Sequence, residues 1–369
     1  MFSQTQTQPP NASDRDINVK DVEDLPTDTV SNICWATKGV VPTFATSDWA
    51  SFIRIYQLDP DTKELTQNAR FDNDSPCLSV RWNEDETKLF TGCADGVVNS
   101  FDLPSGGKCE EIGKHNGPVK SVHWLSEVNI LVTLSFDKTL RFWDLRQDKP
   151  VAGFGLDHKV YCSDLLYPYL AIGLSDAKIL TVDLANVQSQ LEGRINYVDS
   201  PLGTRSQLTA IKLAKVRDRL GVGTSSNDGR CNISIYRTDI SSKLENVMTF
   251  KAQKIEEGKT KQLFPVNSIG FYPDRGYNFM YTVGGEGKMY FWDVDKKDKI
   301  ADFDFNRVAV TQAEIDSTGK YIAYSLGYDW ARGIQDHMSK PSKVCVHELQ
   351  PRELESMYDK SVNYPIRYN

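Results

Sequence analysis

Four side chains near the middle of the chain have the chemistry of a nucleophilic site. They are a histidine, a threonine, an aspartate and a tryptophan, namely His115, Thr133, Asp137 and Trp143. In a catalytic triad, a carboxylate orients a histidine, and the histidine accepts the proton of a hydroxyl nucleophile. The same groups also suit a buried structural network, in which the aspartate accepts from the histidine and the histidine orients the hydroxyl and the indole.

A repeat along the chain distinguishes the two interpretations. Seven segments contain two apolar runs, a turn with Asp or Gly, and a third run: 30–58, 77–103, 119–146, 160–184, 208–236, 266–294 and 310–349. The turn acids Asp95, Asp137 and Asp176 are 42 and 39 residues apart, which is the spacing of four-stranded propeller blades. The four side chains lie on the register of this repeat, so we expect a structural network. The other segments lack the full set, so the third blade should be the stiffest.

The repeat also predicts the fold. Alternation with a period of two in every segment indicates strands that are half buried between stacked sheets. One such sheet cannot bury both of its faces, whereas seven sheets in a ring bury one another and leave only short edges. We therefore predict an all-β chain whose residues 16–350 form a single seven-bladed β-propeller of the WD40 type.

The two ends of the chain differ from the repeat. Residues 16–24, "DINVKDVED", alternate weakly and are expected to pair as the outer strand of the last blade. Residues 1–15 are rich in Gln, Thr and Pro, a composition typical of disorder. Residues 351–369 have no counterpart in the repeat, so we expect a surface appendage.

Composition excludes several classes of protein. No apolar run reaches about 18 residues, so no membrane insertion is expected, and the N-terminal residues lack the apolar core of a secretory signal. The seven cysteines lie singly without a C-x-x-C pair, which argues against a disulfide framework or a zinc site and fits a reducing compartment. No paired carboxylates or phosphate-binding loop stand out, so we expect neither an enzyme nor a cofactor. The net charge of -7 argues against a protein that binds nucleic acid over its whole surface.

Three segments offer candidate contacts for a partner. "KAQKIEEGKTKQ" (251–262) is a polar, mixed-charge loop, which is either a solvated insertion or a contact. "YSLGYDWARG" (324–333) opens a long polar loop with Trp330 and Arg332, and Trp49 lies in a turn. Tryptophan and arginine are enriched at the anchors of protein interfaces. Alternatively, Trp330 fills the seam between the sixth and seventh blades.

Details outside the repeat resemble a known family. They include "LPTDTVSNICW" (25–35), "SFDKTLRFWDLRQDKPV" (135–151), "VYCSDLLYPYLAIG" (160–173) and "FPVNSIGFYP" (264–273), in that order. The chain resembles the WD40 messenger-RNA export factors of the nuclear pore, the Rae-one/Gle-two family, whose sister is the mitotic checkpoint propeller Bub-three. "YDWARG" is similar to the S-Y-D-W-S-K-G pattern of the export factors, whereas the sister lacks that tryptophan.

The resemblance implies a non-enzymatic adaptor. Family members bind the GLEBS motif, an extended segment of an FG-repeat nucleoporin, across one face, where acidic residues of the segment meet basic residues of the ring. At the positions that match the family's basic "KCHR" loop, this chain has "KAQK", in which Lys251 and Lys254 are the basic residues. Phe271 matches an aromatic on the same face, and Asp329, Trp330 and Arg332 match the loop of the seventh blade. Lys254 stands where the family motif has arginine, and a lysine cannot form the bidentate pair that arginine forms with a carboxylate.

The implied role is messenger-RNA export through the nuclear pore complex. The resemblance places the protein in the nucleus and at the nuclear envelope, with some in the cytoplasm, as a monomeric propeller within a heterocomplex. RNA would be contacted only weakly or through the complex, because phosphate attraction provides most of such affinity and this chain is acidic. Two alternatives stay open: a checkpoint adaptor that docks the GLEBS segment of a kinase, and a substrate receptor of a ubiquitin ligase.

Overall fold

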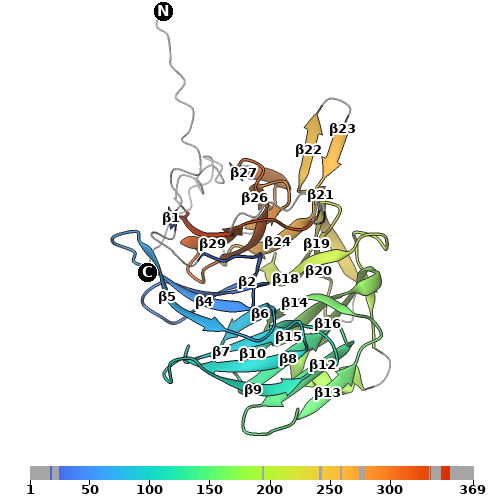
Figure 1. Cartoon of the computed structure of the whole chain (residues 1–369). Helices are drawn as coiled ribbons and strands as arrows, with labels where there is room; N and C mark the ends of the chain where they lie inside the picture. The colour runs from blue at the N-terminus through green and yellow to red at the C-terminus, as the bar shows by residue number, and fades with distance from the viewer. Residues whose placement is uncertain are drawn as a thin grey trace, which may run out of the picture.

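The computed structural model describes residues 17–18, 25–192, 195–240, 243–257, 260–273, 279–331, 333 and 342–349. Its strands form seven four-stranded antiparallel sheets and one separate two-stranded hairpin (Figure 1). The inner strands contact one another in a closed order, β2, β6, β10, β14, β18, β24, β28 and β2 again. The predicted all-β, seven-bladed propeller is therefore confirmed.

The first four blades follow one another along the chain, each with its inner strand first. Blade 1 contains β2 (Val30–Trp35), β3 (Thr43–Asp48), β4 (Phe52–Leu58) and β5 (Leu65–Asp72). Blade 2 contains β6 (Cys77–Trp82), β7 (Lys88–Cys93), β8 (Val97–Asp102) and β9 (Lys108–Lys114). Blade 3 contains β10 (Val119–Leu125), β11 (Ile130–Ser135), β12 (Thr139–Asp144) and β13 (Ala152–Gly155). Blade 4 contains β14 (Val160–Leu166), β15 (Tyr169–Leu174), β16 (Lys178–Asp183) and β17 (Val198–Asp199).

The remaining blades continue the order, with one insertion. Blade 5 contains β18 (Leu208–Val216), β19 (Arg219–Ser226), β20 (Arg230–Tyr236) and β21 (Leu244–Lys251). The hairpin β22 (Lys254–Glu257) and β23 (Thr260–Leu263) follows and projects from the ring (Figure 1). Blade 6 contains β24 (Val266–Phe271), β25 (Phe279–Gly284), β26 (Lys288–Asp293) and β27 (Asp298–Asp304). Two 3-10 turns, η2 (Ser175–Ala177) and η3 (Leu184–Asn186), and the short helix α1 (Val187–Leu191) lie within blade 4.

Blade 7 closes the ring with the two ends of the described chain. It contains β28 (Val310–Ile315), β29 (Tyr321–Leu326), β30 (Lys343–Glu348) and, as its outer strand, β1 (Ile17–Asn18). Ile17 pairs with Val346, and Asn18 pairs with Cys345. The predicted outer strand from segment 16–24 is therefore present at these two residues. The two predicted tails, 1–15 and 351–369, lie outside the described residues.

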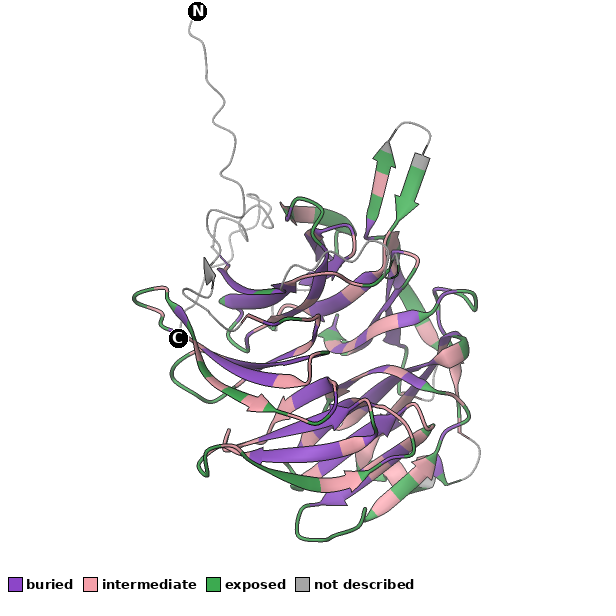
Figure 2. Ribbon diagram, viewed as in Figure 1, coloured by how far each residue is buried: buried purple, intermediate pink, exposed green. Residues whose placement is uncertain are grey.

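The hydrophobic core lies between the blades. Each apolar cluster joins neighbouring sheets: for example, Tyr321 and Val344 of blade 7 pack with Ile33, Phe44 and Tyr56 of blade 1. Figure 2 shows buried residues along the inner strands and exposed residues along the hairpin. The outer strands β9 and β27 are largely exposed, so they lack the apolar pattern by which sequence reveals a strand. No described helix has the length and apolarity needed to cross a membrane.

The antiparallel strands send the connections alternately to two faces of the ring. We call "upper" the face with the links from each outer strand to the next inner strand and the turns between second and third strands. The "lower" face carries the other turns. Every inner strand shifts its register by one residue next to its first residue, at the upper face. The extra residues form what we call the bulge ring: Ser31, Leu78, Lys120, Tyr161, Thr209, Asn267 and Thr311.

A chain that begins at residue 25 tests the closure of the ring. It lacks β1, so the backbone groups at the outer edge of β30 lose their partners, while the pairing of β30 with β29 stays. We expect the free energy of unfolding to fall by about 1–3 kcal/mol, because each backbone hydrogen bond contributes about 1 kcal/mol. Urea unfolding of this chain is compared with that of a chain beginning at residue 15, which should keep full stability. Equal midpoints would show that β1 does not stabilise the closed ring.

Candidate functional site

The four residues with triad-like chemistry form one network in blade 3. The Trp143 indole Nε1 donates to Thr133 Oγ1 at 2.8 Å, and His115 Nε2 lies 2.7 Å from the same hydroxyl. His115 Nδ1 lies 3.2 Å from Asp137 Oδ2. The indole can only donate, so the consistent assignment has the Thr133 hydroxyl donating to Nε2. Nδ1–H then donates to the Asp137 carboxylate and to the Thr139 hydroxyl, which lies 2.9 Å away and itself donates to Asp137.

Burial makes this network structural. The side chains of His115 and Thr133 are fully or almost fully buried, so no substrate reaches the hydroxyl. Burial lowers the pKa of His115 to about 4, although the Asp137 carboxylate opposes the shift. The imidazole is therefore neutral at neutral pH and holds one fixed tautomer. Asp137 also accepts the backbone N–H of Asn116 at 2.9 Å, which ties the link between blades 2 and 3 to the turn of blade 3.

Trp330 lies on the upper face, beside blade 1. Its side chain is 41% exposed, its φ is 60°, and its indole Nε1 donates to Thr29 Oγ1 at 3.2 Å. The ring meets Tyr328 edge to face, with 5.4 Å between the centroids. The alternative in which Trp330 fills the seam between blades 6 and 7 therefore does not describe its position. Arg332, its predicted neighbour in the contact, lies outside the described residues.

Thr29 connects Trp330 to a second exposed tryptophan. The Thr29 hydroxyl donates to the carbonyl oxygen of Tyr328 at 2.8 Å, and its own carbonyl accepts the backbone N–H of Trp49 at 3.0 Å. Trp49, in the β3–β4 turn, is 47% exposed. This turn is held in place by Asp48, which accepts the N–H of Phe52 at 2.9 Å. One threonine thus positions the two tryptophan-bearing turns of blades 7 and 1.

The turn of blade 6 joins Asp329 to the predicted basic segment. Asp329 Oδ2 packs against Gly285, where an added Cβ would come within 2.4 Å of it. The next residue, Glu286, accepts the backbone N–H of Lys254 at 2.8 Å and the hydroxyl of Tyr290 at 2.8 Å. Burial raises the pKa of Glu286. The structure therefore brings the blade 7 loop and Lys254 to adjacent parts of the upper face.

The segment 251–262, expected to be a polar loop, contains instead the hairpin β22–β23. Lys251 ends β21 and is exposed, whereas Lys254 opens the hairpin and its Nζ lies 3.1 Å from Glu256 Oε1. Lys261, across the hairpin from Glu256, lies 3.2 Å from the same oxygen. Cross-strand charge pairs of this kind favour a hairpin over an open loop. Between the two lysines, Ala252 and Gln253 are buried.

Phe271 does not lie with the other predicted contacts. It ends β24 at the lower face, whereas Val266, at the start of that strand, pairs with Gly284 at the upper face. Five steps along an extended strand cover about 16 Å. The Phe271 ring packs over Gly223 of blade 5, where an added Cβ would meet it at 2.9 Å. The prediction that Phe271 shares a face with Lys254 and Trp330 is therefore wrong, because the polarity of its strand carries it to the opposite end.

A cavity of about 440 Å³ lies at the centre of the upper face. Three aromatic rings, those of Trp49, Phe136 and Tyr161, line it on the side of blades 1, 3 and 4, and Asp329 lines it on the side of blade 7. Phe136 and Tyr161 meet edge to face at 5.9 Å between centroids. Sequence reasoning missed these two rings, as well as Thr29 and Glu286. The only signal for them was their position in upper-face turns and links, which becomes visible once the blades are assigned.

The fold and this face define a WD40-type propeller whose upper face carries exposed tryptophans beside a central cavity lined by aromatic and polar side chains. The family model of the WD domain, G-beta repeat, matches residues 65–102 and 107–144. A Caenorhabditis elegans protein described as "mRNA export factor rae-1" is 30% identical over 346 residues, 90% of this chain and 89% of its own length. The "Poly(A)+ RNA export protein" of Schizosaccharomyces pombe is 29% identical over 365 residues, 95% and 98% of the two chains. "Protein Rae1" of Drosophila melanogaster is 28% identical over 361 residues, 95% and 99%.

The chain belongs to the family of WD40 messenger-RNA export factors, the Rae-one/Gle-two family. The resemblance seen in the sequence is thereby confirmed. Each family-model match begins at the outer strand of one blade and ends at the third strand of the next. The sequence repeat is therefore offset from the blade by one strand, which is why the outer strand of the last blade comes from the start of the chain.

The buried neutral His115 predicts a dependence of stability on pH. Its pKa of about 4 in the folded protein is below the ordinary value of 6.5, so the stabilisation is full above pH 6.5 and is lost as pH falls towards 4. Between pH 7.5 and 5 the free energy of unfolding should fall by about 2 kcal/mol, because this histidine takes up a proton more readily in the unfolded chain than in the folded one. His115→Gln should flatten the dependence measured by urea unfolding at each pH, although His123, whose pKa is also lowered by burial, keeps part of it. If the free energy of unfolding of His115→Gln fell with pH as steeply as that of the wild type, the assignment would be contradicted.

Removal of the shared hydroxyl tests the network itself. Thr133→Val leaves the Trp143 indole and the His115 ring without their common partner, so we expect a loss of about 2–4 kcal/mol in the free energy of unfolding. The matched variant is Thr282→Val in blade 6, where the Trp292 indole donates at 3.0 Å and no histidine is among the described partners of the hydroxyl. That change should cost about half as much. Equal losses in thermal or urea unfolding would show that the histidine adds nothing.

Proposed function

We propose that this protein is a non-enzymatic adaptor in messenger-RNA export, which captures an extended GLEBS-type segment of an FG-repeat nucleoporin on its upper face. The observation that carries the proposal is the pair of exposed tryptophans, Trp49 and Trp330, held by Thr29 beside the central cavity. Isolated exposed aromatics are common, but a rigid cluster of them beside a concavity is typical of an anchor site in an interface. Two of the relatives are described as "mRNA export factor rae-1" and "Poly(A)+ RNA export protein", and these names supply the cellular process.

Preorganisation supports this use of the face. The Trp330 indole is held by its hydrogen bond to Thr29 and its contact with Tyr328, so little side-chain entropy is lost when a partner binds. A partner residue that fills the space beside an ordered ring gains buried apolar area without ordering that ring first. Because its indole is both exposed and held in place, we assign the role of anchor in the blade 7 loop to Trp330.

Positive charge on the same face supports an acidic segment as the partner. Lys251 is exposed, and no hydrogen bond or ion pair of its ammonium group exists among the described residues. Lys254 is already paired with Glu256 and offers a weaker attraction. Arg332, two residues after Trp330 in the sequence, is the third basic residue of the proposed contact. Rim charges of this kind raise the association rate and set the register more than they raise affinity.

RNA recognition is a smaller part of the proposal. The net charge of -7 disfavours strong binding to phosphate over the whole surface. We therefore assign RNA contact to the complex with the nucleoporin, and we place the protein in the nucleus, at the pore and its envelope, with a cytoplasmic fraction. The checkpoint and ligase roles gain no specific support from the upper face and serve as outcomes of the experiment below.

Calorimetric titration with a GLEBS-type peptide from an FG nucleoporin of the same organism tests the proposal. Trp330→Ala should weaken binding by about 2–4 kcal/mol, a loss typical of a desolvated aromatic anchor, while circular dichroism shows an intact fold. The matched variant is Leu145→Ala, whose side chain is 38% exposed on the lower face, and it should bind as the wild type does.

Three other results would change the conclusion. If the wild type binds no such peptide, the nucleoporin role is rejected. Binding of a checkpoint-kinase segment alone would favour the checkpoint adaptor, and capture of ligase scaffold subunits would favour the receptor role. If the peptide binds Trp330→Ala as tightly as the wild type, the segment is captured elsewhere than on the blade 7 loop.

A further inference from the structure

Blade 2 contains two cysteines that face each other across neighbouring strands. Cys77 is the first residue of β6, Cys93 is the last residue of β7, and the two are direct partners in the register. The backbone N–H of Ala94 donates to the carbonyl oxygen of Pro76 at 2.9 Å. The next pair along the ladder, Cys77 with Cys93, is therefore one without hydrogen bonds between its backbones, and in such pairs the side chains come closest.

The repeat shows that packing at this position requires no thiol. In the other six blades, the two matching positions hold no cysteine, and the inner strand has an apolar residue there. The matching pairs are Val30 with Asp48, Val119 with Ser135, Val160 with Leu174, Leu208 with Ser226, Val266 with Gly284, and Val310 with Leu326. The cysteine pair is thus a property of blade 2 and not of the fold.

The two thiols contact each other within a set of hydrogen-bond donors. The Cys77 thiol donates to the sulfur of Cys93. Asn73 Nδ2 donates to the same sulfur at 3.2 Å, and Thr91 Oγ1 lies 3.8 Å from it. Asn99 Nδ2 donates to Asn73 Oδ1 at 2.7 Å, which fixes the orientation of the Asn73 amide. Cys93 is therefore the acceptor at the centre of the set.

This environment makes Cys93 the nucleophile of the pair. The hydrogen bond from Cys77, together with Thr91 and Asn73, lowers the pKa of Cys93, although burial opposes the shift. The contact with Cys93 and burial raise the pKa of Cys77. One thiol thus ionises more readily than the other, and the thiolate is the reactive form of cysteine. Both sulfurs are buried, but Asn73 is partly exposed, so Cys93 lies one side chain below the surface.

We propose that Cys77 and Cys93 form a reversible oxidation site, which takes a peroxide as its oxidant and closes a disulfide between β6 and β7. The Cys93 thiolate attacks one peroxide oxygen, the O–O bond breaks, and the hydroxide that leaves takes up the proton released when the thiol ionised. The sulfur of Cys77 then attacks the resulting sulfenic acid, and its proton leaves with the hydroxyl group as a second water. The two thiols lose two electrons, and the peroxide gains them.

The backbone already has the spacing that the product needs. The Cα atoms of a cross-strand pair of this kind are about 4.5 Å apart, and disulfides span Cα separations of about 4.4–6.8 Å. The bond can therefore close without moving either strand far. A dithiol reductant should open it again by exchange through a mixed disulfide.

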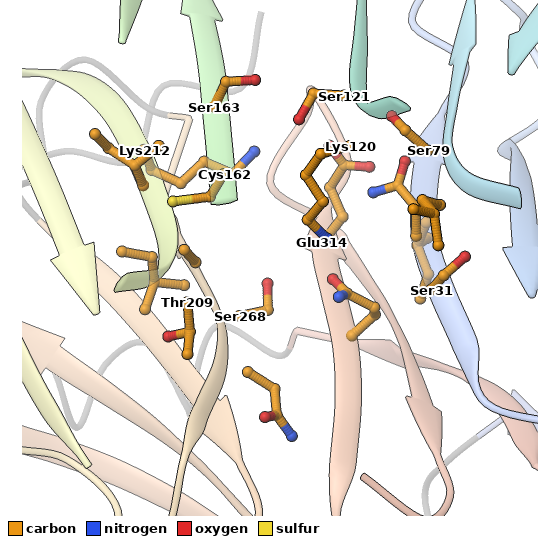
Figure 3. A pocket seen from close by; sticks show the side chains of 18 of the residues that line it. Ser31, Ser79, Lys120, Ser121, Cys162, Ser163, Thr209, Lys212, Ser268 and Glu314 are labelled. Atoms are coloured by element: carbon orange, nitrogen blue, oxygen red, sulfur yellow. The ribbon is translucent and has the colours of Figure 1, made fainter. Parts of the chain in front are cut away.

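The bond would act on the wall of the central channel. Cys77 directly precedes Leu78 of the bulge ring, and its carbonyl oxygen accepts the hydroxyl of Ser31 from blade 1. Ser31 and Ser79 lie on neighbouring inner strands at one side of the channel (Figure 3). A covalent tie at Cys77 would therefore fix the start of β6 where blades 1 and 2 meet, and with it the side of the upper cavity that Leu78 lines.

Peptide mapping of the full chain after treatment with hydrogen peroxide tests the proposal. Trypsin places the two cysteines in separate peptides, 71–81 and 89–108, so the bond joins these into one product that is two hydrogens lighter than their sum. We expect this product in the treated wild type and its loss after dithiothreitol. The Tm of the oxidised protein should exceed that of the reduced protein by about 2–5 °C, because the cross-link constrains the unfolded chain.

Two variants copy blade 3, which has Val119 and Ser135 at the matching positions. Cys77→Val and Cys93→Ser should each form no linked product and show no Tm shift. Cys109→Ser, at the exposed cysteine of the same blade, should keep both. The treated wild type decides by itself, even if a variant unfolds. The proposal is overturned if both thiols can still be alkylated after unfolding, or if Cys93 becomes a sulfinic acid without the linked product. Peptide binding enters none of these outcomes, so they are independent of the adaptor role.

Discussion

Packing between neighbouring sheets is the constraint on which the rest of this structure depends. No blade has a core of its own, because the apolar clusters join the side chains of adjacent blades, such as Tyr321 with Phe44. A ring of such sheets is stable only if it closes, and closure here uses the pairing of Ile17 with Val346 at the outer edge of blade 7. The inner strands of blades 7 and 1 complete the contact at the axis. Stability is therefore shared around the whole ring, and the loops are free to carry function.

Buried polar groups add specificity to this packing. In blade 3, the neutral His115 joins a turn carboxylate to a hydroxyl and an indole, so every polar atom of the network has a partner. Blade 6 keeps the indole and the hydroxyl but has the buried Gln253 in its preceding link. Fully satisfied networks of this kind fix one arrangement of link and turn. The chemistry that looked catalytic in the sequence is thus explained by burial.

The upper face combines two kinds of feature with different origins. Irregular segments, such as the blade 7 loop with Trp330 and the β22–β23 hairpin, are particular to one blade. The bulge ring, in contrast, arises from the repeat itself and provides the same position in all seven blades. A partner that crosses this face would meet the exposed tryptophans at the rim and the bulge ring at the centre. Regular architecture therefore supplies the positions, and single substitutions within it supply the chemistry.

The sequence by itself determined the all-β class, the number of blades, their first three strands and the members of the blade 3 network, because alternation and repeat spacing are local properties of the chain. It also indicated the family through "YDWARG" and related segments. Only the tertiary structure decided which residues share a face. Strand polarity moved Phe271 to the lower end, and ring closure brought Thr29 to Trp330 across 301 positions of sequence. Which side chains line the central cavity also depends on all seven blades, and no local pattern contains that information.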